Sequence, residues 1–147
     1  MADSVDITIF EETAAESGEL ISYGVPLTAY PTGSGVIIVN SPGSGELKDG
    51  REDRWKNLGL HLQERALATL VTYNAPRPDF QVQLEWEPYS YRGASWNKLL
   101  IESLSHTIDW SLENAVQLTG TESPAVYLTG FSSGGSAVGA VANRYPS

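Results

Sequence analysis

The chain has 147 residues, with 9 Lys and Arg against 18 Asp and Glu, and a formal net charge of −9 at neutral pH. It contains no cysteine, which excludes disulfides, thiolate-bound zinc and a cysteine nucleophile. The acidic balance argues against a nucleic-acid partner, because binding of the phosphate backbone needs a basic surface. The length and a hydrophobic content of 41% predict one domain over residues 1–147 with its own core.

The first third of the chain carries most of the negative charge. Its first 47 residues hold seven acidic side chains and no Lys or Arg. A secretory signal needs a basic start followed by an apolar run, and this segment shows the reverse. No stretch approaches the roughly 18 apolar residues of a membrane span. We therefore expect a cytoplasmic protein with no membrane partner, and we expect the acidic N-terminus to be a solvated pair of strands rather than a recognition patch.

The first half of the sequence predicts three strands and a helix. Val5–Phe10 alternates apolar and polar residues, and Val25–Tyr30 is a second, weaker strand. Four β-branched residues within Val36–Asn40 predict a strand covered on both faces. This strand stops at residues 41–45, Ser-Pro-Gly-Ser-Gly, which favour a turn. A helix is expected over Asp53–Ala66, and its apolar face consists of Trp55, Leu58, Leu62 and Ala66.

The second half alternates buried strands with helices. Strands are expected at 67–73 and 125–129, and alternation over 80–86 allows a short extra strand. Helices are expected at 96–118 and 134–144. The apolar stripe of the longer helix consists of Leu100, Leu104, Ile108, Leu112 and Ala115. This order predicts an α/β fold with a mainly parallel sheet, entered by an antiparallel N-terminal pair of strands.

Residues 130–134, Gly-Phe-Ser-Ser-Gly, form a G-x-S-x-G motif between the last strand and a helix of small residues. A nucleophile elbow occupies this place, because the serine must sit in a tight, strained turn that lifts its hydroxyl above the sheet. The positions around the serine must be nearly free of side chains, or the strand and the helix collide. Gly130, Gly134 and Gly135 meet that need. The helix N-terminus adds positive potential for a developing oxyanion, so Ser132 is the candidate nucleophile.

With these residues in place, the sequence resembles the α/β-hydrolase fold family over nearly its whole length. Val36–Asn40 and the loop at 41–45 are similar to the family's third strand and oxyanion loop, with Pro42 where many members carry His. The resemblance implies that the backbone N–H groups of Ser44 and Ser133 are the oxyanion donors. The dienelactone-hydrolase-like and related esterase branches are the most similar. The implied activity is hydrolysis of an ester or related acyl bond in a small-molecule substrate, with no cofactor and no metal.

The sequence departs from the family after the elbow. Members order the triad as Ser, acid and His along the chain. Residues 133–147 contain no Asp, Glu or His, and both His61 and His106 precede Ser132. Each histidine is expected to be an ordinary surface or boundary residue. The family's sheet has eight strands and this chain supplies about five. We therefore expect the N-terminal half of an α/β-hydrolase-type, mainly parallel sheet with helices on both faces, or a truncated relative.

Two hypotheses about function stay open. In the first, the chain is the nucleophile-bearing N-terminal half of a serine hydrolase. In the second, it is a non-catalytic α/β domain or assembly partner that keeps the elbow as architecture. Both leave the strand at 125–129 at a sheet edge, where its apolar, uncharged backbone invites pairing. The expected partner is a complementary C-terminal fragment or a second copy in a homo-oligomer. Nucleotide binding is not expected, because the glycines at 41–45 lack P-loop or dinucleotide-fingerprint spacing.

Overall fold

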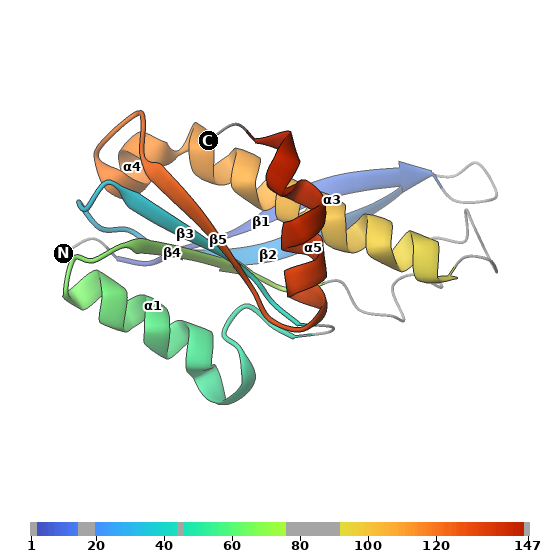
Figure 1. The fold of residues 1–147 in the computed structure, drawn as a ribbon, viewed down its shortest axis with the longest axis horizontal. Coiled ribbons are helices and arrows are strands. Elements are labelled where there is room, and N and C mark those ends of the chain that lie inside the picture. Colours follow the sequence, from blue (N-terminus) through green and yellow to red (C-terminus); the bar gives the residue numbers. More distant parts are fainter. Residues whose placement is uncertain (1–2, 15–19, 44–45, 76–91, 146–147) are drawn as a thin grey trace.

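The structure is a computed structural model that describes residues 3–14, 20–43, 46–75 and 92–145. Within these ranges five strands form one sheet in the order β1-β2-β4-β3-β5 (Figure 1). The strands are β1 (Val5–Ala14), β2 (Leu20–Tyr30), β3 (Val36–Ser41), β4 (Thr69–Tyr73) and β5 (Ala125–Gly130). The helices are α1 (Arg54–Glu64), α3 (Arg92–Glu113), α4 (Ala115–Thr119) and α5 (Ser133–Val141), with single-turn 3-10 helices η1 (Arg51–Asp53) and η2 (Ala142–Arg144).

The sheet is mixed, and the expected α/β class is confirmed. β1 and β2 form the antiparallel N-terminal pair, and β2 also pairs antiparallel with β4. β3 lies between β4 and β5 and runs parallel to both. The parallel part of the sheet therefore consists of β4, β3 and β5, whose carboxyl ends lie at the same edge. In open α/β sheets this edge is where ligands bind.

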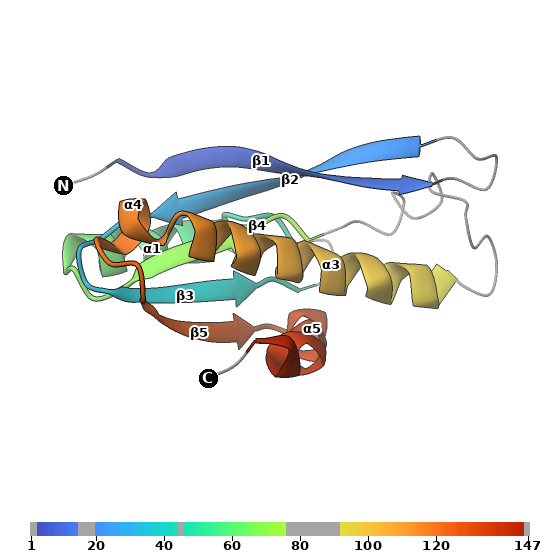
Figure 2. The same ribbon diagram turned by 90° about the horizontal axis from the view of Figure 1, so that it is seen from above.

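Helices cover both faces of the sheet, as expected. α1 lies on one face, and α3 and α5 lie on the other (Figures 1 and 2). The main core fills the space between the sheet and α3 and α5. It consists of Val25, Leu27, Ala29, Ile37, Val39, Val71 and Tyr73 from the sheet and Leu104, Ile108, Leu118, Ala137 and Val141 from the helices. Burial of this apolar layer contributes most to the stability of the fold, and it holds the carboxyl ends of the strands in place.

The buried face of α1 differs from the expected one. Leu58 and Ala66 are exposed, and Gly59 and Gln63 are buried instead. Gly59 lies so close to the Tyr30 ring that a Cβ would stand 2.3 Å from its Cδ2 atom. Gln63 Nε2 donates to the Pro31 carbonyl at 3.0 Å. Close backbone approach and one buried amide, rather than an apolar stripe, dock this helix.

The long helix expected at 96–118 is two helices that meet at Asn114. The side chain of Asn114 donates to the Trp110 carbonyl at 2.8 Å, and such local bonding competes with the regular helix ladder. Gly120 ends α4 with φ 78°, as its position predicts. Leu112, expected on the buried stripe, is 42% exposed, whereas Leu104 and Ile108 are buried.

The extra strand expected at 80–86 lies outside the described residues. Among the helices of the described ranges, none combines the length and apolar character needed to cross a bilayer.

Candidate active site

Ser132 occupies a sharp turn between β5 and α5, as the motif predicts. Its backbone has φ 56° and ψ −123°, a conformation that non-glycine residues rarely adopt. Such strain costs about 1–3 kcal/mol and persists only where the surroundings impose it. Here the constraints come from both sides, because Phe131 N donates to Ser41 O at 3.1 Å and Gly135 N donates to Ser132 O at 2.9 Å. The exposed Ser132 is thus held between the end of a strand and the first turn of a helix.

Two glycines of the motif are required by close backbone contacts. A Cβ on Gly134 would lie 2.0 Å from the Ser41 carbonyl oxygen, and one on Gly130 would lie 2.6 Å from the Gly134 backbone. Gly135, which the sequence suggests for the same reason, has more room, since its Cβ would stand 3.8 Å from Gly130 O. The elbow therefore needs Gly130 and Gly134 for steric reasons.

The loop after β3 lies beside the elbow. Gly134 faces the Ser41 and Pro42 carbonyls, and Gly43 lies against the Phe131 ring, where a Cβ would stand 3.1 Å from its Cδ2 atom. Ser44, a predicted oxyanion donor, lies outside the described residues. The other predicted donor, Ser133, is the first residue of α5, so its backbone N–H belongs to the turn that follows Ser132. The structure thus brings the residues around both predicted donors to one edge of the sheet.

Ser132 lines a pocket with a volume of about 440 Å³. Its other lining residues come from the loop after β3, from η1 and α1, and from the elbow: Gly43, Glu46, Leu47, Gly50, Arg51, Arg54 and Phe131. The described lining residues therefore supply one hydroxyl, two arginines and one carboxylate.

No family model matches the sequence, and no curated protein matches it either. Solved structures do match. One is an arylesterase, with a TM-score of 0.57 and 17% identity over 97% of this chain. Another is the dienelactone hydrolase of Anabaena variabilis, with a TM-score of 0.54 and 18% identity over 90% of this chain. The chain has the α/β-hydrolase fold. It spans 40% of the length of the first of these structures and 55% of the second.

Within this α/β-hydrolase fold, Glu46 is the polar centre of the pocket wall. Its Oε1 accepts from Gly43 N at 3.2 Å and from Trp55 Nε1 at 2.8 Å, and its Oε2 pairs with Arg54. Burial alone would raise the pKa of Glu46, but the hydrogen bonds from Trp55, Arg54 and Gly43, with the charge of Arg54, together hold this pKa below its ordinary value. Glu46 is therefore an anion with its acceptor sites engaged.

A row of polar side chains crosses the sheet close to the site, on consecutive register positions of the five strands. The row consists of Asp6, Thr28, Thr72, Asn40 and Thr129. Thr28 donates to Asp6 at 2.5 Å, Asn40 donates to Thr72 at 3.3 Å, and Thr129 donates to Asn40 at 3.1 Å. The row ends one residue before Gly130, so the buried polar groups beside the elbow are satisfied within the sheet.

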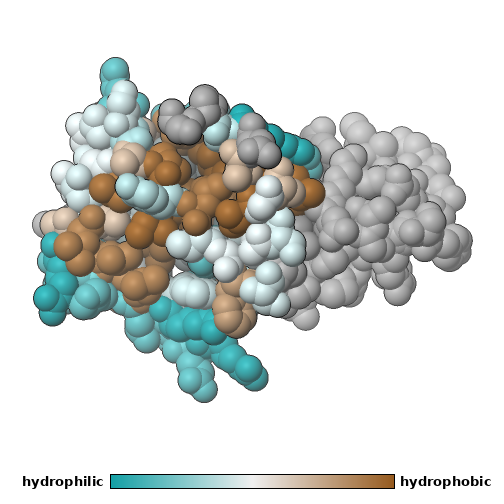
Figure 3. Space-filling model, viewed as in Figure 1, coloured by the Kyte–Doolittle hydropathy of each residue, from teal (hydrophilic) through white to brown (hydrophobic). Residues whose placement is uncertain are grey.

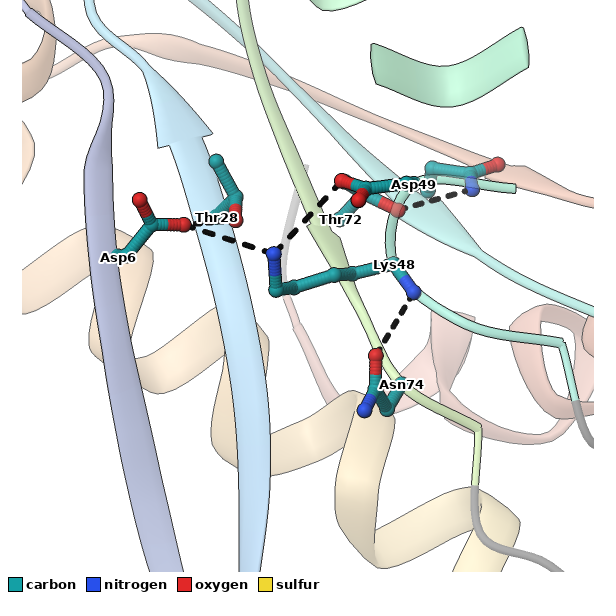
Figure 4. Close-up of polar contacts among 7 residues, drawn as sticks. Asp6, Thr28, Lys48, Asp49, Thr72 and Asn74 are labelled. Carbon is teal, nitrogen blue, oxygen red and sulfur yellow. Dashed lines mark hydrogen bonds and ion pairs between the residues drawn. The ribbon is translucent and has the colours of Figure 1, made fainter. Parts of the chain in front are cut away.

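Lys48 fastens the loop after β3 to this row. Figure 4 shows its ammonium between Asp6 and Asp49, at 3.5 and 3.6 Å. Its backbone N–H donates to Asn74 Oδ1 at 2.8 Å. Because Lys48 turns toward β1, it does not line the pocket that Ser132 faces.

Neither histidine lines the pocket. His61 is exposed on α1, and His106 is half-buried on α3. Glu46 is the one carboxylate that lines it among the described residues. The site as described therefore has a hydroxyl in an elbow but no imidazole beside it.

The edge of the sheet next to the elbow is exposed. β5 is the last strand of the described sheet, and Tyr127 at its centre is 60% exposed. An apolar groove of about 570 Å³ runs along it, lined by Ile108, Leu112, Pro124, Ala125, Val126, Tyr127, Leu128, Ala142 and Tyr145. Figure 3 shows apolar surface gathered over this side of the molecule. The exposure of Leu112 follows, because it borders the groove instead of the core.

Some residues of the site were not found from the sequence. From the sequence, Glu46 is only one of the seven acidic residues in the first 47 positions, and nothing singles out Arg54. Their pairing joins a loop to a helix eight residues away, and no spacing rule indicates it. The elbow was found because its steric requirement lies within five consecutive residues.

Proposed function

We propose that the chain is the nucleophile-bearing part of a serine hydrolase that cleaves an ester or a related acyl bond in a small molecule. The observation that supports this most directly is the backbone of Ser132, with φ 56° and ψ −123°, between two glycines that tolerate no Cβ. Strained backbone of this kind lowers the stability of the fold, and it occurs most often at active sites. The nucleophile elbow of a serine hydrolase lies at such a turn between a strand and a helix.

In the proposed reaction, Ser132 Oγ attacks the acyl carbonyl carbon while a base takes the hydroxyl proton. The carbonyl electron pair moves to its oxygen, and the backbone N–H groups of Ser44 and Ser133 stabilise the oxyanion that forms. The C–O bond to the leaving alcohol then breaks, and the alcohol takes the proton from the base. Water then attacks the acyl-serine carbonyl while the base takes a proton from the water. The bond to Ser132 Oγ breaks, the serine takes that proton from the base, and the acid product leaves.

Among the described residues no histidine lines the pocket beside Ser132, and a serine hydroxyl without a base is a poor nucleophile. The exposed edge of β5 supports a site of assembly next to the elbow. We propose that a complementary polypeptide segment pairs with this edge and carries the acid and the histidine. A second copy of the chain is the alternative partner. Its histidines would have to approach Ser132 across the interface.

A second candidate function has one observation in its favour. No histidine lines the pocket within the described residues, which suits an α/β domain that keeps the elbow as architecture. The two candidates differ in whether Ser132 reacts at all.

A fluorophosphonate probe separates them. Without a base the modification of Ser132 is expected to be slow but stoichiometric and specific, since an oxyanion hole still accelerates attack when triad members are missing. Ser132→Ala is expected to abolish modification. Ser136→Ala is the matched control, because Ser136 is an exposed serine on α5, the helix that directly follows Ser132. Modification spread evenly over exposed serines, or none at Ser132, would favour the architectural role.

A further inference from the structure

Arg54 joins the loop after β3 to the elbow itself. Its guanidinium pairs with Glu46 and lies 4.7 Å from the centre of the Trp55 ring and 4.2 Å from that of Phe131. Phe131 directly precedes Ser132 and lies against Gly43. A planar cation over aromatic rings is a specific contact that a lysine does not reproduce. Arg54 thus contacts both the carboxylate that holds Gly43 and the residue before the nucleophile.

Glu46 holds Gly43 through both side chain and backbone. Its carboxylate accepts from Gly43 N, and its own N–H donates to the Gly43 carbonyl at 3.0 Å. The backbone of Glu46 is anchored in turn, because its carbonyl accepts from Ala75 N at 2.9 Å. Gly43 N is engaged by Glu46 and is therefore not a donor for a ligand. These hydrogen bonds hold Gly43, the residue directly before Ser44, in place.

Two arginines from the helix side line the pocket together with Glu46. Arg54 of α1 is its ion-pair partner, and Arg51 of η1 lines the same pocket. Lys48 pairs instead with Asp6 and Asp49 (Figure 4). The side chain of Glu46 is 11% exposed and that of Arg54 is 37% exposed, so the pair is partly shielded from solvent.

We propose that Glu46 and Arg54 are positioning residues that lock the loop after β3 against the elbow and so align the oxyanion loop with Ser132. The catalytic part of this inference rests on the proposed function. The mechanical part does not, because it states only that the Glu46 carboxylate and the Phe131–Ser132 backbone are coupled through Arg54. Protonation of Glu46 weakens its pairing with Arg54, and the coupling is then lost.

The mechanical part is tested on the chain by nuclear magnetic resonance of Gly43, Phe131, Ser132 and the Trp55 indole. In the wild type, all four N–H signals are expected to move together on acidification, with one midpoint below 4.5, the ordinary pKa of Glu46. Glu46→Gln is expected to abolish this transition, and Glu64→Gln, at an exposed position on α1, is expected to leave it unchanged. A Trp55 transition that Phe131 and Ser132 do not share would overturn the proposal.

Arg54→Lys separates the two links. It is expected to keep the Gly43 amide protected from hydrogen exchange, because Glu46 still accepts from it, while the Phe131 and Ser132 signals shift. If Phe131 and Ser132 keep their wild-type signals in both Arg54→Lys and Glu46→Gln, the coupling does not exist.

The catalytic part is tested by the rate of fluorophosphonate modification at Ser132. Glu46→Gln is expected to slow it about tenfold at saturating probe without changing the half-saturating concentration, since alignment rather than binding is lost. An unchanged rate in a variant that lacks the spectroscopic coupling overturns the positioning role alone. No modification of the wild type, with the coupling present, contradicts the proposed function and leaves the mechanical link standing.

Discussion

Replacing Gly134 by Ala is expected to destabilise the chain strongly, whereas the same change at Gly139 in the same helix is expected to be tolerated. The new Cβ at position 134 would lie 2.0 Å from Ser41 O and 2.6 Å from Pro42 O. Both are backbone atoms, which cannot rotate away. A Cβ at position 139 would have no heavy atom within 4 Å apart from those of its chain neighbours and the adjacent helix backbone. Neither glycine has a positive φ, so the difference between them is steric.

The size of the effect follows from these distances. Overpacking costs typically about 1–3 kcal/mol, and here relief requires moving α5 away from the end of β3. We therefore expect a loss of about 3 kcal/mol for Gly134→Ala. Gly139→Ala is expected to gain about 0.5–1 kcal/mol, because alanine loses less backbone entropy than glycine in a helix. Gly135→Ala, with its nearest contact at 3.8 Å, is expected to lie near the wild type.

Urea unfolding followed by circular dichroism measures the three variants against the wild type. Thermal unfolding gives a second measure. At this chain length 1 kcal/mol corresponds to roughly 3 °C in Tm, so the Tm of Gly134→Ala is expected to be about 10 °C lower. A Gly134→Ala variant within about 0.5 kcal/mol of the wild type would refute the geometry of the elbow. Equal losses at positions 134 and 139 would refute it too.

Three further outcomes are expected. The chain alone is expected to hydrolyse p-nitrophenyl acetate no faster than Ser132→Ala, because no histidine lines the pocket in the described residues. A hydrolysis rate that Ser132→Ala abolishes would mean that His61 or His106 is recruited. If two copies of the chain pair at the β5 edge, the chain is expected to associate in sedimentation at micromolar concentration. Tyr127→Lys is then expected to weaken association by charging this edge, and a wild-type monomer throughout would contradict pairing between copies. The hydrogen bond from Thr28 lowers the pKa of Asp6, so its stabilisation is present above the ordinary value of 3.8 and is lost as the pH falls through the folded value. Because Asp6 is largely exposed, Asp6→Asn is expected to lower the free energy of unfolding by less than about 1 kcal/mol at pH 7 and not at all at about pH 2. An equal loss at both pH values would contradict stabilisation by the ionised form of Asp6.

What the sequence predicted well depended on local geometry. The spacing of Gly130, Ser132 and Gly134 indicates an elbow because a strand and a helix must meet within four residues there. The β-branched run in β3 indicates burial for a similarly local reason. These features require no knowledge of the rest of the chain.

What the sequence did not predict depended on contacts between distant segments. The docking face of α1 is set by the Tyr30 ring and the Pro31 carbonyl, so an apolar stripe was the wrong guide. The polar row from Asp6 to Thr129 exists only once the register of all five strands is known. The Glu46–Arg54 pair likewise needs a loop and a helix brought together.

In the proposed function, Ser132 is the nucleophile, and the amides of Ser44 and Ser133 bind the oxyanion that forms on the substrate. A crystal structure of the chain after reaction with diisopropyl fluorophosphate tests it most directly. We expect a phosphoryl group bonded to Ser132 Oγ, with its free oxygen about 2.7–3.1 Å from both amide nitrogens. A phosphoryl group on another serine, or one on Ser132 whose oxygen points away from both amides, would contradict it.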